Sequence, residues 1–147
     1  MTRFDSLADA GAALVPLVRT AAAGLDDPCL VAIAPHGVPV AEAIAAELGL
    51  TVFAVAVDPE GQPPAVVDAR VAGRAVIVVD DGVETGTAAR AVGTLLRQDH
   101  PSRLLLAVPV CPREAQPMLE SVYDAVVAID RPLVRRDLRW HYRERPA

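Results

Sequence analysis

The sequence contains no lysine, and this absence excludes two kinds of chemistry. All fourteen residues of the Lys and Arg class are arginines. A Walker A loop needs a lysine for the phosphates of its nucleotide, and a Schiff base forms on a lysine amine. The chain is therefore neither a Walker A protein nor an enzyme that works through a lysine Schiff base.

Cysteines, histidines and long apolar runs are scarce as well. Cys29 and Cys111 lie beside apolar residues, which indicates reduced thiols in a core, and the three histidines are scattered without zinc-binding spacing. Although 52% of the residues are hydrophobic, no apolar stretch approaches the roughly 20 residues that span a bilayer. The N-terminus has no signal-peptide pattern. We therefore expect a cytoplasmic protein with no metal-ligand residues and no membrane partner.

The charges are distributed unevenly along the chain. The formal net charge is −5, yet residues 131–147 contain six arginines against two acids, Asp137 and Glu144, which leaves +4 on this tail and −9 on the rest. A basic tail favours nucleic acid as a partner, but an acidic body opposes broad contact with a phosphate backbone. We therefore do not expect a nucleic acid partner. Instead, we expect these arginines to pair with the acidic body or to lie at the subunit contact of a homodimer.

Apolar runs typical of strands alternate with helical patterns along the chain. A length of 147 residues suits one domain, and the alternation predicts a parallel sheet with right-handed crossovers. We expect a single α/β domain over residues 1–147, a Rossmann-like parallel sheet of about five strands with helices on both faces. The expected strands are Cys29–Ala34, Thr51–Val57, a run ending at Val79, Arg103–Val110 and Ala125–Ile129, and the expected helices are 6–22, Val38–Leu48, Thr87–Arg97 and Glu114–Leu119, with a loop over 58–64.

The segment of residues 75–88, AVIVVDDGVETGTA, carries the clearest functional signal. An apolar run typical of a strand buried on both faces ends at Asp80 and Asp81, and ligands bind at the carboxyl ends of strands in open α/β sheets. The Thr-Gly-Thr of residues 85–87 places hydroxyl and backbone N–H groups at a helix N-terminus, which suits an anion. Two carboxylates can accept hydrogen bonds from ribose hydroxyls. The segment therefore fits a ribose phosphate, and equally a strand, a turn and a capped helix with two solvated acids.

This segment resembles the phosphoribosyl pyrophosphate (PRPP) motif of the type I phosphoribosyltransferases, in which apolar residues precede two acids, a short variable stretch and Thr-Gly. The resemblance implies that the two acids hold the ribose hydroxyls and that the following loop binds the 5-phosphate. The family usually has Thr or Ser where this chain has Ala88, so one hydroxyl of the phosphate site is missing. The substrate-binding residues that the resemblance implies in this motif are Asp80, Asp81, Gly82, Val83, Glu84, Thr85, Gly86, Thr87 and Ala88.

A second loop of interest, at Pro35, His36 and Gly37, lies between the first strand and its helix. In the family the pyrophosphate loop occupies this place, and a bacterial subgroup that the chain resembles more closely reads Pro-Arg-Gly-Gly-Val-Pro-Val there. This chain reads Pro-His-Gly-Val-Pro-Val, which is one residue shorter and has His36 in place of the arginine. The resemblance implies that these three residues contact the pyrophosphate. His36 can donate to a pyrophosphate, and it can equally cap its own helix.

The resemblance extends over roughly residues 28–147, and it implies Mg²⁺ held mainly by PRPP and water. Two parts of the family fold look reduced. Asp58 follows the second strand, where the family usually has a basic residue, and only residues 58–74 lead to the next strand. A long flexible loop that closes over the substrate and excludes water has no room there. We therefore expect a type I core with a reduced hood and flexible loop.

Two further features bear on the chemistry. Glu84 stands directly before Thr-Gly, where the 6-oxopurine branch of the family has an acid that assists proton transfer at the base. The resemblance thus makes Glu84 a candidate catalytic residue, although it can equally point into solvent. Trp140 or Tyr142 can stack on a base, or pack on its own domain.

The sequence therefore predicts a protein that binds PRPP or a nucleotide 5-phosphate. As an enzyme it would transfer the phosphoribosyl group to a nitrogenous base and release pyrophosphate. The alternative is a non-catalytic regulatory module that uses the same pocket to sense PRPP or a nucleotide. A more remote alternative is a domain that keeps the fold for assembly alone.

Overall fold

The computed structural model describes residues 3–58, 60, 62, 70–133, 135 and 137–144. Most of the loop predicted over 58–64 lies outside the described residues. In chain order the elements are α1 (Leu7–Ala22), β1 (Cys29–Ala34), α2 (Gly37–Leu48), β2 (Val52–Ala56), β3 (Ala75–Val79), α3 (Thr87–Arg97), β4 (Arg103–Val110), the short 3-10 helix η1 (Arg113–Ala115), α4 (Gln116–Glu120), β5 (Ala125–Asp130) and the 3-10 helix η2 (Leu138–His141).

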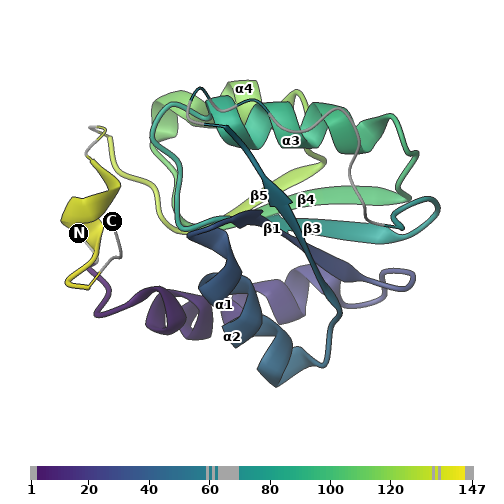
Figure 1. The fold of residues 1–147 in the computed structure, drawn as a ribbon, viewed down its shortest axis with the longest axis horizontal. Helices are drawn as coiled ribbons and strands as arrows, with labels where there is room; N and C mark the ends of the chain where they lie inside the picture. Colours follow the sequence, from purple (N-terminus) through teal and green to yellow (C-terminus); the bar gives the residue numbers. More distant parts are fainter. Residues whose placement is uncertain are drawn as a thin grey trace.

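The strands form one five-stranded sheet in the order β2-β1-β3-β4-β5, and every neighbouring pair is parallel. Helices α1 and α2 cover one face of this sheet, while α3 and α4 cover the other (Figure 1). The predicted α/β architecture is thereby confirmed. Strand order reverses between β1 and β3, because the chain moves outward from β1 to β2 and then returns to the other side. Ligand sites in open α/β sheets lie at the carboxyl ends of strands at such a switch point.

Strand β3 is buried on both faces, and its alternating side chains join the two apolar layers of the protein. Val76 and Val78 belong to the layer under α3, whereas Ile77 and Val79 belong to the layer under α1 and α2. Successive side chains of a strand point to opposite faces, so a strand between two helical layers needs an unbroken apolar run. The run of β-branched residues in the sequence thus has a direct packing reason.

One local expectation needs correction, and one large apolar residue of α1 is not buried. The short helix predicted over Glu114–Leu119 is a 3-10 turn followed by α4, which ends one residue later. In α1, Leu7, Leu14 and Val18 are buried, but Leu17 is 40% exposed. At about 100° per residue, Leu17 points roughly 80° away from the stripe that the other three share, so the helix turns it toward solvent.

The two ends of the described chain pair with each other beside the sheet (Figure 1). The Phe4 amide donates to the His141 carbonyl at 2.7 Å, and the Arg143 amide donates to the Phe4 carbonyl at 2.8 Å. The rings of Phe4 and Tyr142 also contact each other, with centroids 5.6 Å apart. The C-terminal segment, defined here as residues 137–144, is therefore fixed to the N-terminus of the chain.

The arginines of the tail are partly accounted for by contacts within the chain. Arg143 lies 3.2 Å from the Asp5 carboxylate, in a pair whose side chains are both largely exposed. Arg131 donates to the Val126 carbonyl at 2.7 Å and to the side chain of Gln116. Exposed ion pairs contribute little to stability, so the Arg143–Asp5 pair adds little to the stability of the fold.

Cys29 and Cys111 are free thiols buried in the core. Burial raises the pKa of both thiols above the usual range, which keeps them in the unreactive protonated form. None of the helices in the described ranges is long and apolar enough to cross a membrane.

Asp124 joins the start of β4 to α3. Its carboxylate accepts from the Leu104 amide at 2.9 Å and lies 3.1 Å from the Arg97 guanidinium. Partial burial alone raises the pKa of Asp124, but the Leu104 amide and Arg97 together lower it below its usual range. The charged form of Asp124 is therefore favoured in the folded protein.

We expect Asp124→Ala to reduce the free energy of unfolding at neutral pH by about 1 kcal/mol. Because the pKa of Asp124 is lower in the folded than in the unfolded protein, its charge stabilises the fold above the unfolded value of about 3.9, and this contribution is lost as the pH falls through the folded value. Urea unfolding of both proteins from neutral pH downward measures the difference, with the exposed Asp99→Ala as the control. A gap between wild type and variant that does not shrink in acid would contradict this account.

Candidate functional site

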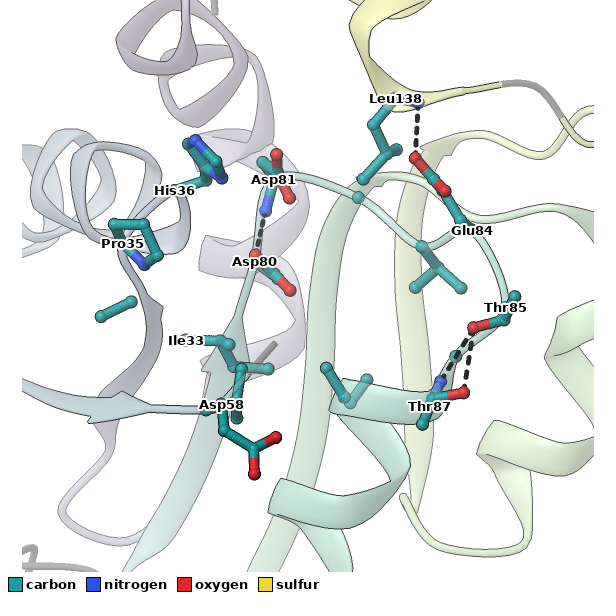
Figure 2. Close-up of a pocket in the computed structure, with 17 residues that line it drawn as sticks. Ile33, Pro35, His36, Asp58, Asp80, Asp81, Glu84, Thr85, Thr87 and Leu138 are labelled. Atoms are coloured by element: carbon teal, nitrogen blue, oxygen red, sulfur yellow. Dashed lines mark hydrogen bonds between the residues drawn. The ribbon is translucent and has the colours of Figure 1, made fainter. Parts of the chain in front are cut away.

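An open cavity of about 400 Å³ lies where β1, β2 and β3 end. Its wall is formed by the last residues of β1 with the loop that follows, by the residues after β2, by the β3–α3 loop (residues 80–86) with the start of α3, and by Leu138 of the C-terminal segment (Figure 2). The cavity thus occupies the switch point of the sheet, where the topology predicts a ligand.

The two acids of the motif follow directly after β3 and both line the cavity. The Asp80 carboxylate accepts a hydrogen bond from the Asp81 amide at 2.8 Å, which fixes the first turn of the loop. Asp81 is only 3% exposed, and its carbonyl accepts from the Tyr142 hydroxyl at 2.6 Å. The two residues therefore have different environments, because Asp80 is partly exposed and Asp81 is buried.

The Thr-Gly-Thr stretch forms the entrance to α3 on the opposite side of the cavity. Gly86 is the N-cap of α3 in a left-handed conformation, and it has no side chain with which to cap the helix. The hydroxyls of Thr85 and Thr87 lie 3.0 Å apart beside it (Figure 2). The start of a helix offers backbone N–H groups and the positive end of the helix dipole, which favour an anion. Both threonines, Gly86 and Ala88 line the cavity.

The loop between β1 and α2 forms the third side. Pro35 and His36 line the cavity, whereas Gly37 does not. Gly37 instead packs against the end of β3, because a Cβ atom there would lie 2.6 Å from the Val79 carbonyl oxygen. His36 is the N-cap residue of α2, but its side chain makes no capping hydrogen bond. The interpretation of His36 as a helix cap is therefore wrong, while its role toward a pyrophosphate stays a prediction.

The cavity is strongly acidic. Asp58, Asp80, Asp81 and Glu84 all line it, and His36 is the one side chain among the described lining residues that can become cationic. One oxygen of Asp58 already accepts from the amides of residues 60 and 62, at 3.0 and 2.7 Å. An anion bound here would therefore be held by neutral donors (backbone N–H groups and the threonine hydroxyls), by His36, by the helix dipole and by a cation that accompanies it.

The donor set of the cavity fits a hard cation held mainly by its ligand. In the described part of the chain, no three His, Cys, Asp or Glu side chains are grouped closely enough to hold a metal ion by themselves. The lining carboxylates are nevertheless oxygen ligands of the kind that Mg²⁺ prefers, and Mg²⁺ commonly binds through one or two carboxylates together with phosphate oxygens and water. The residues present therefore fit Mg²⁺ that arrives with a phosphorylated ligand.

Leu138 is a lining residue that the sequence did not indicate. It begins η2, and its amide donates to the Glu84 carboxylate at 2.9 Å (Figure 2). The only sequence signal was an apolar residue next to Asp137 in a basic tail, which by itself does not point to a cavity. Glu84 is exposed as a residue, yet one of its oxygens has this definite partner.

Neither Trp140 nor Tyr142 is among the described residues that line the cavity. The Arg3 guanidinium lies over the Trp140 ring, 5.2 Å from its centroid, while Tyr142 is 3% exposed. Of the two roles that the sequence left open for these aromatic residues, packing on their own domain is the one that the structure shows.

Gly37→Ala is expected to lower the free energy of unfolding by about 1–3 kcal/mol. The added methyl group would meet the Val79 carbonyl, which is backbone of a buried strand and cannot rotate away. Urea denaturation measures the loss, and Glu47→Ala, at an exposed position of the same helix, should stay within about 0.5 kcal/mol of the wild type. Equal stability of Gly37→Ala and the wild type would show that the start of α2 is not held against β3.

Known proteins match this chain in family and in fold. The model of the phosphoribosyl transferase domain family matches residues 5–132. No curated protein sequence matches significantly. The crystal structure of TT1426 from Thermus thermophilus superposes with a TM-score of 0.86 at 24% identity, covering 99% of this chain and 93% of that one.

Two named transferases share the fold at lower identity. A purine phosphoribosyltransferase from Pyrococcus horikoshii superposes with a TM-score of 0.65 at 18% identity, covering 86% of each chain. A hypoxanthine-guanine phosphoribosyltransferase from Bacillus anthracis superposes with a TM-score of 0.67 at 15% identity, covering 86% of this chain and 77% of that one. At these identities the superpositions show the fold, and the family match covers most of the chain. This chain therefore belongs to the phosphoribosyl transferase domain family.

Proposed function

We propose that this protein binds PRPP, or a nucleotide through its 5-phosphate, and transfers the phosphoribosyl group to a nitrogenous base. One observation carries the proposal: a single cavity brings the Asp80–Asp81 pair to face the Thr-Gly-Thr entrance of α3, in a chain of this family. The purine specificity of structural neighbours supports a base as acceptor, since both named transferases act on purines.

The cavity suggests a place for each part of PRPP. The ribose hydroxyls would donate to the carboxylates of Asp80 and Asp81. The 5-phosphate would accept hydrogen bonds from the backbone of the β3–α3 loop and from the hydroxyls of Thr85 and Thr87. The pyrophosphate would lie toward Pro35 and His36, at the other end of the cavity. Within the site Gly37 would act indirectly, because it sets the approach of its loop to β3.

The reaction would exchange one bond at the anomeric carbon for another. A ring nitrogen of the base forms the C–N bond, the C–O bond to pyrophosphate breaks with its electron pair on the leaving group, and the ring nitrogen loses its proton to solvent water. Positive charge develops on the ribose ring as this bond breaks, and the nearby carboxylates of Asp80 and Asp81 stabilise that charge. Mg²⁺ bound with PRPP would neutralise charge on the leaving pyrophosphate.

We expect Mg²⁺-PRPP to stabilise the protein against heat. Ligand at about 100 times its dissociation constant adds about 2.7 kcal/mol, or several degrees in Tm for a chain of this size. Without Mg²⁺ the shift should be smaller, because the phosphates then face the four lining carboxylates with no cation between them. Pyrophosphate release with a panel of nucleobases measures turnover, and Asp80→Asn should abolish it. The Asn side chain can still accept from the Asp81 amide, so this variant removes charge and keeps the loop.

The matched control is Asp99→Asn, an exposed acid outside the cavity, which should leave binding and turnover unchanged. No thermal shift with PRPP, nucleotides or ribose phosphates would overturn the proposed function.

A second candidate is favoured by the charge of the cavity. Asp58 and three further acids line it, with no arginine among the described lining residues. Such a cavity has no arginine to stabilise a departing pyrophosphate, which suits a regulatory module that senses PRPP or a nucleotide without turnover. Clear binding of PRPP or nucleotides together with no pyrophosphate release across the panel would favour this module over the enzyme.

Ala88→Ser should tighten binding of the 5-phosphate about tenfold. The serine adds a hydroxyl in the first turn of α3, and this hydroxyl can donate a hydrogen bond to the charged phosphate. Isothermal titration with ribose 5-phosphate, which lacks both pyrophosphate and base, isolates this contact. Ala91→Ser lies in the same helix outside the cavity and should change the affinity less than twofold. Equal affinities for the two variants would place the 5-phosphate elsewhere.

We also propose that the protein is a cytoplasmic homodimer, as expected from its sequence. Light scattering of the purified full chain measures the mass in solution, and a monomer at all concentrations would contradict the dimer.

A further inference from the structure

The β3–α3 loop is attached to the C-terminal segment at three points. The Glu84 carboxylate accepts from the Leu138 amide at 2.9 Å, and the Asp81 carbonyl accepts from the Tyr142 hydroxyl at 2.6 Å. Between them, Gly82 leaves room for the Leu138 side chain, because a Cβ on Gly82 would lie 2.5 Å from Leu138 Cδ2. These contacts join residues that are 54 and 61 positions apart in the sequence.

Glu84 completes the N-terminal cap of η2. The first amides of a helix have no partner within the helix. In η2 the Asp137 carboxylate accepts from the Arg139 amide at 2.8 Å, which leaves the Leu138 amide to be satisfied from elsewhere. The Glu84 carboxylate, from the β3–α3 loop, accepts the hydrogen bond of the Leu138 amide. The Glu84 carboxylate thus has a structural partner in the protein without ligand.

The direction of the Glu84 side chain is consistent with this role. Figure 2 shows its carboxylate turned toward Leu138 and away from Thr85 and Thr87. An acid within an anion-binding loop weakens anion binding by repulsion unless its charge is directed elsewhere. Here the hydrogen bond holds the charge on the side of the C-terminal segment, away from the Thr85 and Thr87 hydroxyls at the start of α3.

We propose that Glu84 is a positioning residue that holds the C-terminal segment, with Leu138, as one wall of the cavity, and that it takes no part in proton transfer. The wall is the buried side chain of Leu138, which is 7% exposed. The expected effect on ligand binding rests on the proposed function, whereas the attachment of the C-terminal segment to Glu84 does not. Because the same loop would hold the 5-phosphate, a loosened segment weakens ligand binding.

The first experiment tests the attachment in the protein without ligand. Amide hydrogen exchange at Leu138 should become about tenfold faster in Glu84→Ala, because its acceptor is gone. Glu84→Gln keeps a carbonyl oxygen of the same reach and should hold the rate within about threefold of the wild type. Glu47→Ala, which is exposed on α2, is the control and should leave this amide unchanged. Unchanged exchange in Glu84→Ala would overturn the proposal, whatever the protein binds.

The second experiment separates positioning from proton transfer. With Mg²⁺-PRPP and an accepted base, Glu84→Gln should keep kcat within about threefold of the wild type and the same pH profile, while Glu84→Ala raises KM for PRPP about tenfold. If Glu84 transfers a proton, both variants lose kcat alike and one limb of the pH profile disappears, which would overturn the proposal. If the wild type neither binds nor turns over PRPP, the proposed function fails, and the exchange experiment alone decides the role of Glu84.

Discussion

The burial of β3 between two helical layers is the constraint on which the site depends. Its side chains alternate between the two apolar layers, so the strand has no polar position until it leaves the sheet after Val79. Asp80 therefore stands at the first position that is partly exposed, with the buried Asp81 next to it. Gly37 then brings the start of α2 against the same strand end, since no larger residue fits beside the Val79 carbonyl. The end of β3 and the close packing of α2 against it together shape the cavity at the switch point of the sheet.

The chemistry of the cavity is uneven, with anion-binding groups that come from the backbone and side chains that are mostly acidic. Gly86 exposes the N-terminus of α3, whereas Asp58, Asp80, Asp81 and Glu84 bring negative charge. A phosphorylated sugar can satisfy both, because its hydroxyls bind to acids and its phosphate binds to amides. Repulsion between the remaining phosphates and the acids makes a divalent cation an expected companion of the ligand.

The C-terminal segment connects this cavity with the N-terminus of the chain. Leu138 and Tyr142 contact the β3–α3 loop, while the backbone of His141 and Arg143 pairs with Phe4. An acid next to Thr-Gly invites a catalytic interpretation from sequence, but the structure gives Glu84 a hydrogen-bond partner across the fold. The C-terminal segment and the β3–α3 loop therefore hold each other in place.

The sequence by itself determined the strands and helices, in places to the residue, as for Cys29–Ala34 and Thr87–Arg97. It also indicated two of the loops that line the cavity, after β1 and after β3, because apolar runs and glycine turns are local signals and parallel strands end at one edge. Only the tertiary structure decided that Gly37 packs behind the cavity, that His36 does not cap its helix and that Leu138 forms a wall. The positions of Gly37 and Leu138 depend on atoms from segments tens of residues apart, and no periodicity or local motif encodes which distant side chain fills a given space.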